Sequence, residues 1–311
     1  INKMKKKVIV IQGGKSKERE ISLKTAQSCI KAIKKIGYSV IKFDPKFSSI
    51  LNIKKIKADI IFNALHGKNG EDGTIQSFFE YFRKRYTHSG VLSSMLAMNK
   101  SLSKKIFIDN GIKTPNFFQI HEKFKAEDKL KKNIKKNKIN FPVVIKPNDE
   151  GSSIGVKICQ NFKILKKEFK NLRKKYKNLI IETYIPGKEI QVAIMGGKAI
   201  GAIELRPKRK FYDYKAKYKR TSKTAHIMPA EIPINKYREV LKISEKANKV
   251  LGCKGITRCD FRFNKGKFFI LELNTQPGMT DLSLVPEIAK FAKIPFTKLV
   301  KWMINDASLN R

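Results

Sequence analysis

The chain has 311 residues, of which 41% are hydrophobic, enough for two or three compact units with their own cores. No apolar run approaches the roughly 20 residues that cross a bilayer, and the basic start continues into strand-like sequence without a cleavable apolar core. We therefore expect a globular, cytoplasmic protein without a membrane partner. The first residue is Ile1 rather than Met, which makes Met4 a candidate start.

The 68 Lys and Arg side chains against 26 Asp and Glu give a formal net charge of +42, which alone would favour nucleic acid as a partner. The lysines are, however, spread along the whole chain among many Ile and Asn residues, as an AT-rich coding bias produces on solvated faces. The sequence has no zinc-finger spacing, no RRM-type aromatic motif and no heptads behind a basic region. We therefore expect a dispersed surface charge rather than a nucleic-acid function.

The four cysteines form no CxxC pair, and together with four scattered histidines they make no zinc-type cluster. We expect reduced, structural thiols. They are Cys29, Cys159, Cys253 and Cys259.

The first region alternates strand and helix patterns. KKVIVIQGG (6–14) is a short apolar run that ends in glycines, and the following helical pattern ends at Gly37 before a second strand. KADIIFNALHG (57–67) is another buried-type strand that ends in a turn. Strands that alternate with helices predict right-handed crossovers and a mostly parallel sheet, with functional loops at the strand ends.

After residue 88 the residue pattern becomes typical of helices. FPVVIKPNDEGSSIGVKIC (141–159) predicts two strands around a glycine-serine loop, and residues 178–205 predict further strands with two glycine-containing turns. We find no internal repeat. The expected fold class is α/β and α+β, with three units at residues 1–88, 89–183 and 184–311.

GITRCDFRFNKGKFFILELNTQPG (255–278) predicts a hairpin with its turn near Gly266. A two-residue loop would set Asp260 against Leu271 and mix apolar with charged positions on both faces. A three-residue loop, 265–267, keeps one face apolar, and register follows the face that must be buried. We therefore expect the pairs Phe261 with Leu271 and Phe263 with Phe269.

On the other face of this hairpin, Asp260 then lies opposite Glu272, and Arg258 opposite Asn274. Directly opposed like charges destabilise a sheet, so this pairing favours a cation between the two carboxylates. Oxygen ligands alone, two carboxylates and an amide, suit Mg²⁺. The alternative is a surface hairpin whose charges point into water.

A magnesium site predicts phosphate-binding parts elsewhere. VVIKPNDEGSSIGV (143–156) places Lys146 at a strand end before a loop with Ser152 and Ser153, where small residues let backbone N–H groups approach a phosphate. GGKS (13–16) is not a P-loop, because Ile9 replaces the glycine that this motif requires.

Six segments in this order resemble the ATP-grasp carboxylate-amine ligases, and more narrowly the D-alanine-D-alanine ligases. Together they span nearly the whole chain. The segments are GGKSKEREIS (13–22), ALHGKNGEDGTIQ (64–76), YTHSGVLSSMLAMNK (86–100), IKPNDEGSSIGV (145–156), FYDYKAKY (211–218) and ELNTQPGMTDLSLVP (272–286).

The resemblance implies an ATP-grasp fold with an N-terminal α/β substrate domain (1–88), a central ATP-grasp subdomain (89–183) and a C-terminal one (184–311), whose two sheets clamp ATP. It implies that ATP phosphorylates one D-alanine and that the amine of a second D-alanine attacks this acyl phosphate. The product, D-alanyl-D-alanine, serves peptidoglycan synthesis. The resemblance also implies two Mg²⁺ ions, with Mn²⁺ as a substitute, and a homodimer.

The resemblance assigns Lys100 and Lys146 to the α and β phosphates of ATP and Lys217 to the γ phosphate, with Ser152 and Ser153 in the phosphate loop. It assigns the adenine to Glu182 and the backbone of Tyr184 and Ile185, and the ribose to Glu189. Two Mg²⁺ ions are assigned to Asp260, Glu272 and Asn274.

For the substrates, the resemblance assigns the ammonium of the first D-alanine to Glu18 and its carboxylate to His66. It assigns an oxyanion hole to Arg258 and the N–H of Gly278, and the carboxylate of the second D-alanine to Ser283 and the backbone of Leu284. Without the resemblance, Glu18 reads as a helix-start carboxylate and Ser283 as an N-cap. The expected catalytic residues are Glu18, Ser152, Tyr218, Arg258, Gly278 and Ser283.

In the family a lid tyrosine, here Tyr218, bonds the serine of the glycine-serine loop, here Ser152. An intact lid favours the dipeptide over D-alanyl-D-lactate, and we expect residues 206–226 to move for product release. Two residues depart from the family pattern. Gln276 stands where a small residue is common, and Asp281 adds a carboxylate near the acceptor site. Two alternatives stay open, a ligase with another acceptor such as D-lactate and a basic nucleic-acid-binding protein on the same fold.

Overall fold

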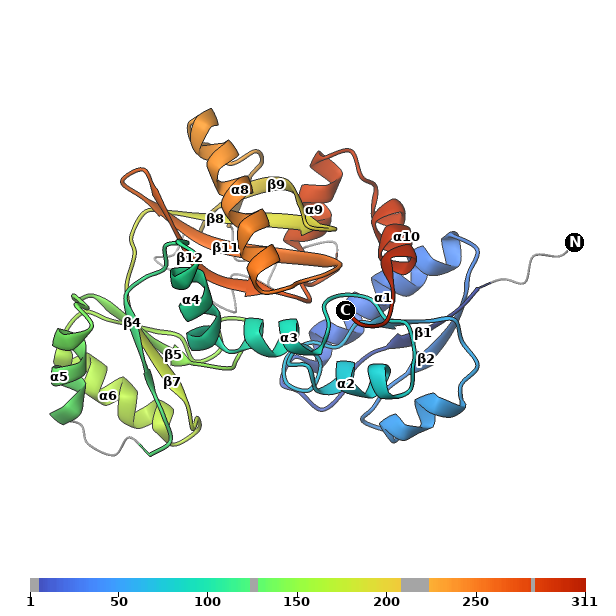
Figure 1. Cartoon of the computed structure of the whole chain (residues 1–311), viewed down its shortest axis with the longest axis horizontal. Helices are drawn as coiled ribbons and strands as arrows, with labels where there is room; N and C mark the ends of the chain where they lie inside the picture. The colour runs from blue at the N-terminus through green and yellow to red at the C-terminus, as the bar shows by residue number, and fades with distance from the viewer. Residues whose placement is uncertain (1–5, 124–127, 208–223, 281–282) are drawn as a thin grey trace, which may run out of the picture.

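The computed structural model describes residues 6–123, 128–207, 224–280 and 283–311, and three sheets organise them (Figure 1). None of the helices in these ranges has the length and apolar character needed to span a bilayer. All four cysteines are buried and unbridged, which confirms the predicted structural thiols.

The first sheet is parallel, as predicted. Its strands β1 (Lys7–Ile11), β2 (Ser39–Phe43) and β3 (Ile60–Asn63) are ordered β2-β1-β3. Helix α1 (Arg19–Lys35) connects β1 to β2, the 3-10 helix η1 (Ile50–Lys55) precedes β3, and α2 (Thr74–Tyr81) follows it. The apolar run of β1 is buried because α1 packs on one face and a second apolar cluster fills the other.

The second sheet has four antiparallel strands in the order β4-β7-β5-β6. They are β4 (Phe117–Ile120), β5 (Val143–Pro147), β6 (Lys157–Cys159) and β7 (Leu179–Thr183). Helices α5 (Asp128–Lys136) and α6 (Phe162–Arg173) contribute apolar side chains to the core on one face, which leaves the other face toward the third sheet (Figure 1).

The third sheet has five antiparallel strands in the order β10-β9-β8-β11-β12. They are β8 (Lys188–Met195), β9 (Lys198–Arg206), β10 (Ala225–Ile227), β11 (Ile256–Asn264) and β12 (Lys267–Asn274). Helix α8 (Ile234–Val250) packs in the core on one face, while α9 (Leu284–Phe291) and α10 (Phe296–Asp306) share a core with α1 of the first sheet. This shared core joins the first and third sheets.

Helices α3 (Val91–Met98) and α4 (Lys100–Asp109) pack on the third sheet. Ala97 and Phe107 belong to the same core as Phe261 and Ile270. The segment after residue 88 thus belongs to the core of the last strands. The predicted domain boundaries at 88/89 and 183/184 stay predictions.

The hairpin β11–β12 corrects the predicted loop. Asn264 pairs with Lys267, so the turn has two residues, Lys265 and Gly266, both with positive φ. A β-bulge at Leu271 then shifts the register by one residue, so Asp260 still pairs with Glu272.

The two apolar pairs that we expected are therefore wrong, because Phe269 pairs with Arg262 and Leu271 is the bulge residue, which lines the cleft. Phe261 pairs with Ile270 and Phe263 with Phe268. The reason is that a two-residue turn with positive φ at both positions matches strand twist, while the bulge restores the pairing beyond it.

We expect Lys265→Asn to raise the free energy of unfolding by about 0.5–1 kcal/mol, because asparagine accepts a positive φ at lower cost than lysine. Urea unfolding of both proteins measures this difference. Lys267→Asn, at the exposed start of β12, is the matched control and should not stabilise. Equal effects of the two substitutions would contradict the turn assignment.

Candidate active site

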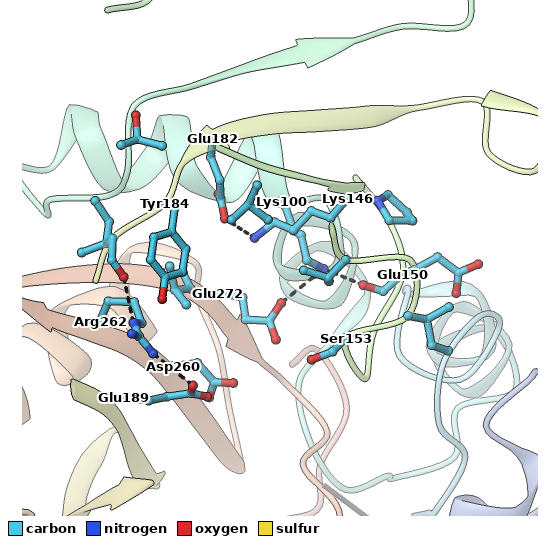
Figure 2. A pocket seen from close by; sticks show the side chains of 17 residues that line it. Lys100, Lys146, Glu150, Ser153, Glu182, Tyr184, Glu189, Asp260, Arg262 and Glu272 are labelled. Carbon is cyan, nitrogen blue, oxygen red and sulfur yellow. Dashed lines mark hydrogen bonds and ion pairs between the residues drawn. The ribbon is translucent and has the colours of Figure 1, made fainter. Parts of the chain in front are cut away.

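A cleft of about 800 Å³, including space open to solvent, lies between the second and third sheets (Figure 2). Strands β5 and β7 line one side, and β8, β11 and β12 line the other. Nine residues that the sequence assigned to nucleotide or metal line this one cleft: Lys100, Lys146, Ser153, Glu182, Tyr184, Ile185, Glu189, Asp260 and Glu272.

Lys100 is the first residue of α4, and its side chain contacts the glycine-serine loop and strand β12. Its Nζ donates to the backbone oxygen of Glu150 at 2.6 Å and lies 3.3 Å from Oε2 of Glu272 on β12. The ammonium thus ties the start of the glycine-serine loop to one of the predicted metal ligands. A cation in this place can meet an anionic group that enters the cleft.

Glu182 is 3% exposed and has a lysine at each carboxylate oxygen. Lys146 Nζ lies 2.5 Å from Oε1 and Lys104 Nζ lies 3.0 Å from Oε2. Burial raises the pKa of Glu182, but the two lysine charges outweigh burial and hold the pKa below its ordinary value. The predicted adenine residue and one predicted phosphate lysine are thus an ion pair in the cleft (Figure 2).

Tyr184, Ile185 and Glu189 lie at the far end of the cleft around Arg262. The guanidinium donates to the backbone oxygen of Ile185 at 3.0 Å, contacts Oε2 of Glu189 at 3.3 Å and lies 5.9 Å from the ring centre of Tyr184. The sequence reasoning did not single out Arg262, because nothing in the hairpin pattern distinguishes it from other surface arginines.

The predicted metal ligands lie on two adjacent strands. Asp260 pairs with Glu272, and Asn274 pairs with Arg258, as expected. Arg258 bonds Asp260 through Nε at 2.7 Å and Nη2 at 2.9 Å. The bulge turns Leu271 and Glu272 toward the cleft together, since both line it. The hairpin is therefore no surface hairpin with charges in water.

Glu18 connects the first sheet to the glycine-serine loop. It precedes α1, but its side chain makes no capping hydrogen bond, and Ser152 Oγ donates to its Oε2 instead. A Cβ added at Gly151, or at Gly67 with its positive φ, would lie 3.0 Å from Oε1 of Glu18. Two glycines therefore enclose this buried carboxylate closely.

His66 is buried between two partners. Its Nδ1 lies 3.0 Å from Oε1 of Glu71 and its Nε2 lies 3.0 Å from Oγ1 of Thr25 on α1. Both ring nitrogens are thus bonded, which fixes the plane of the imidazole. Glu71 was not predicted, although it stands inside one of the matching segments.

Gly278 and Ser283 lie side by side after β12. A Cβ at Gly278 would come within 2.9 Å of Ser283 Oγ, which also accepts from the N–H of Thr280 at 2.9 Å. Ser283 precedes α9 but makes no side-chain cap, and Leu284 is the buried first residue of that helix. Gly278, predicted for the oxyanion hole, therefore lies beside Ser283, predicted for the acceptor site. The N-cap interpretation does not describe the side chain of Ser283.

Three predicted residues lie outside the described residues: Lys217, Tyr218 and Asp281. The same holds for residues 208–223, the larger part of the predicted lid.

Gln276 joins this region to the first sheet. The side chain is 1% exposed, its Oε1 accepts from Nδ2 of Asn63 at 2.9 Å, and its Nε2 donates to the backbone oxygen of Leu65. Its own N–H donates to Oδ1 of Asn274 at 2.8 Å. The departure noted in the sequence is thus a tether between the end of β3 and a predicted metal ligand.

Two sheets that face each other across a cleft of lysines and carboxylates, closed by a glycine-serine loop, define an ATP-grasp ligase. Two family models match, described as D-ala D-ala ligase C-terminus over residues 106–305 and D-ala D-ala ligase N-terminus over residues 46–89. The chain belongs to the D-alanine-D-alanine ligase family.

Named relatives support this membership over the whole length. A D-alanine–D-alanine ligase of Pelagibacter ubique is 51% identical, covering 99% of this chain and all of the relative. The Bacillus anthracis D-alanine–D-alanine ligase complexed with ATP is 32% identical, with a TM-score of 0.84 and 97% of both chains covered. The VanG D-Ala:D-Ser ligase of Enterococcus faecalis is 27% identical, with a TM-score of 0.84, covering 97% of this chain and 99% of that one.

We expect Gln276→Met to lower the free energy of unfolding by about 1–3 kcal/mol, because the buried oxygen of Leu65 loses its donor while packing volume is kept. Urea unfolding measures the loss. Gln160→Met, at an exposed position, is the matched control and should change stability by less than about 0.5 kcal/mol. If both variants were equally stable, the tether would contribute nothing.

Proposed function

We propose that the chain joins two molecules of D-alanine, with ATP as energy source, to give D-alanyl-D-alanine and ADP for peptidoglycan precursor synthesis. The observation that carries this proposal is the Ser152–Glu18 contact, which connects the loop at the nucleotide cleft to a buried carboxylate of the first sheet. Two reactants that bind on the two sides of this contact would meet there.

In the proposed reaction, Glu18 holds the ammonium of the first D-alanine by a charge-assisted hydrogen bond, and His66 lies near its carboxylate. Lys100 and Lys146 hold the α and β phosphates, and Lys217 holds the transferring γ phosphoryl group. The carboxylate oxygen attacks this phosphorus, and ADP leaves. Fixed positive charge on the phosphates lowers the barrier because it needs no rearrangement of solvent.

The second D-alanine binds through its carboxylate to Ser283 and the backbone of Leu284. Its neutral amine attacks the acyl carbon, and Arg258 and the N–H of Gly278 stabilise the oxyanion that forms. Phosphate then leaves and the amine proton is lost, which completes the peptide bond. The proximity of Gly278 to Ser283 supports an oxyanion hole next to the acceptor pocket.

Asp260, Glu272 and Asn274 fit Mg²⁺. The set is oxygen only, the two carboxylates face each other on paired strands, and both line the cleft. Among the described residues no three His, Cys, Asp or Glu side chains gather into a metal-holding group, so the amide of Asn274 would complete the set. Two Mg²⁺ ions, or Mn²⁺, would supply charge neutralisation at the terminal phosphates.

We further propose a cytoplasmic homodimer. Helices α2 and α3 expose three large apolar side chains, which a second copy of the chain could cover: Tyr81, Leu92 and Met95. Light scattering measures the oligomeric state, and a monomer at micromolar concentration would contradict this proposal.

A second candidate function is ligation to a different acceptor. The similarity to a ligase named for D-Ala and D-Ser is the specific observation that favours it. Phosphate release from Mg-ATP with D-alanine, L-alanine, or D-alanine plus D-lactate or D-serine, with products identified by mass, separates the two. We expect D-alanyl-D-alanine from D-alanine alone. Without D-alanine-dependent release from folded, ATP-binding protein the ligase proposal fails.

We expect Glu18→Gln to raise the KM for the first D-alanine by about tenfold to a hundredfold, since a charge-assisted hydrogen bond is worth about 1.5–3 kcal/mol. Steady-state phosphate release at saturating ATP measures it. Glu20→Gln, an exposed carboxylate in the first turn of α1, is the matched control. An unchanged KM in an active Glu18→Gln enzyme would remove the proposed ammonium site.

We expect Glu272→Gln to raise the Mg²⁺ concentration for half-maximal activity by about tenfold or more, because a neutral amide binds a hard cation more weakly than a carboxylate. A Mg²⁺ titration at fixed ATP measures the shift. Exposed Glu122→Gln controls for loss of negative charge. The same Mg²⁺ requirement in both variants would argue against a metal at the hairpin.

A further inference from the structure

Lys104 is a fully buried ammonium that the reaction above does not use. Its side chain is 0% exposed, on α4 one turn after Lys100, and it is not among the residues that line the cleft. Nζ lies 3.0 Å from Glu182 Oε2 and 2.7 Å from Oγ1 of Thr114. A buried charge is costly to keep, which makes its place beside Glu182 informative.

The ammonium is fixed from several elements. Thr114 Oγ1 donates to the backbone oxygen of Ile270 on β12, and the ring centre of Phe117 on β4 lies 5.8 Å from Nζ. Lys104 is therefore held outside the lining of the cleft, whereas Lys146, on the other oxygen of Glu182, lines it. Of the two lysines on Glu182, Lys146 lines the cleft and Lys104 does not.

We propose that Lys104 is a positioning residue for nucleotide selection: it stays with Glu182 as a fixed counter-charge, so that Lys146 can leave for phosphate while Glu182 remains an ionised acceptor for the base. The inference rests on the proposed roles of Glu182 and Lys146. It adds that base selection depends on a residue that never touches the nucleotide.

The charge balance shows why a second lysine is needed. If Lys146 were the only partner, its movement toward a phosphate would leave an uncompensated buried carboxylate, which would take up a proton. Burial lowers the pKa of Lys104 to about 8 against the opposing attraction of Glu182, so the ammonium is still mostly protonated near neutral pH. The fixed ion pair therefore persists when Lys146 departs.

An ionised carboxylate accepts hydrogen bonds and cannot donate them. It therefore favours a base with a 6-amino group, as in ATP, over one with a 6-oxo group, as in inosine triphosphate. Loss of Lys104 lets Glu182 become protonated, and a protonated carboxyl also donates to a 6-oxo base. The ratio of the two affinities reports on Lys104 directly.

Calorimetric titration of ATP and of inosine triphosphate into the full chain, without alanine, tests the inference independently of the ligase reaction. We expect Lys104→Met to reduce the preference for ATP at least tenfold, while Lys105→Met, an exposed lysine on the same helix, leaves it unchanged. Equal weakening of both nucleotides by Lys104→Met, or no change in either, would overturn the inference.

Two further variants keep the test decisive. Glu182→Gln should remove most of the preference, and an unchanged preference there would overturn the inference by removing the site on which it rests. If Lys104→Met does not fold, the nearly isosteric Thr114→Val replaces it, since it loosens the ammonium without deleting the charge. We expect a smaller reduction in the same direction, and an unchanged preference would again overturn the inference.

Discussion

The architecture depends on one constraint, that a charge removed from water needs a partner of opposite charge. Around the cleft, Lys104 and Lys146 neutralise Glu182. Lys100 forms an ion pair with Glu272, and Arg258 forms a bidentate ion pair with Asp260. Each pair joins different elements or fixes a side chain at the cleft wall. Helix α4 thus contacts the second sheet through Lys104 and the third sheet through Lys100.

The same constraint separates two kinds of lysine in a chain of net charge +42. Most lysines lie exposed on helices and turns, whereas three buried or nearly buried ones surround the cleft: Lys100, Lys104 and Lys146. A charge excess of this size is therefore compatible with an ordinary enzyme interior. The lysines that matter for function are the few that are buried.

Pattern and spacing were sufficient for the parallel first sheet and for the unbridged thiols. They also predicted the Asp260–Glu272 pair, but through a three-residue loop, whereas the structure reaches this pair through a two-residue turn and a bulge. They were insufficient for Lys104, which in the run SLSKKIF is indistinguishable from exposed Lys105. Burial of a lysine is decided by contacts with β7 and β12, far along the chain. The predicted length of the hairpin loop was wrong for a related reason, because the bulge has no sequence signature of its own here.

That bulge separates two demands that a plain hairpin would couple. The tip of the hairpin follows turn chemistry at Lys265 and Gly266, while the base follows the pairing of Asp260 with Glu272, and the extra residue at Leu271 absorbs the difference. Sequence drift at the tip is thereby insulated from the carboxylates. A protein engineer could graft a different turn or a fused peptide there without shifting the residues that face the nucleotide cleft.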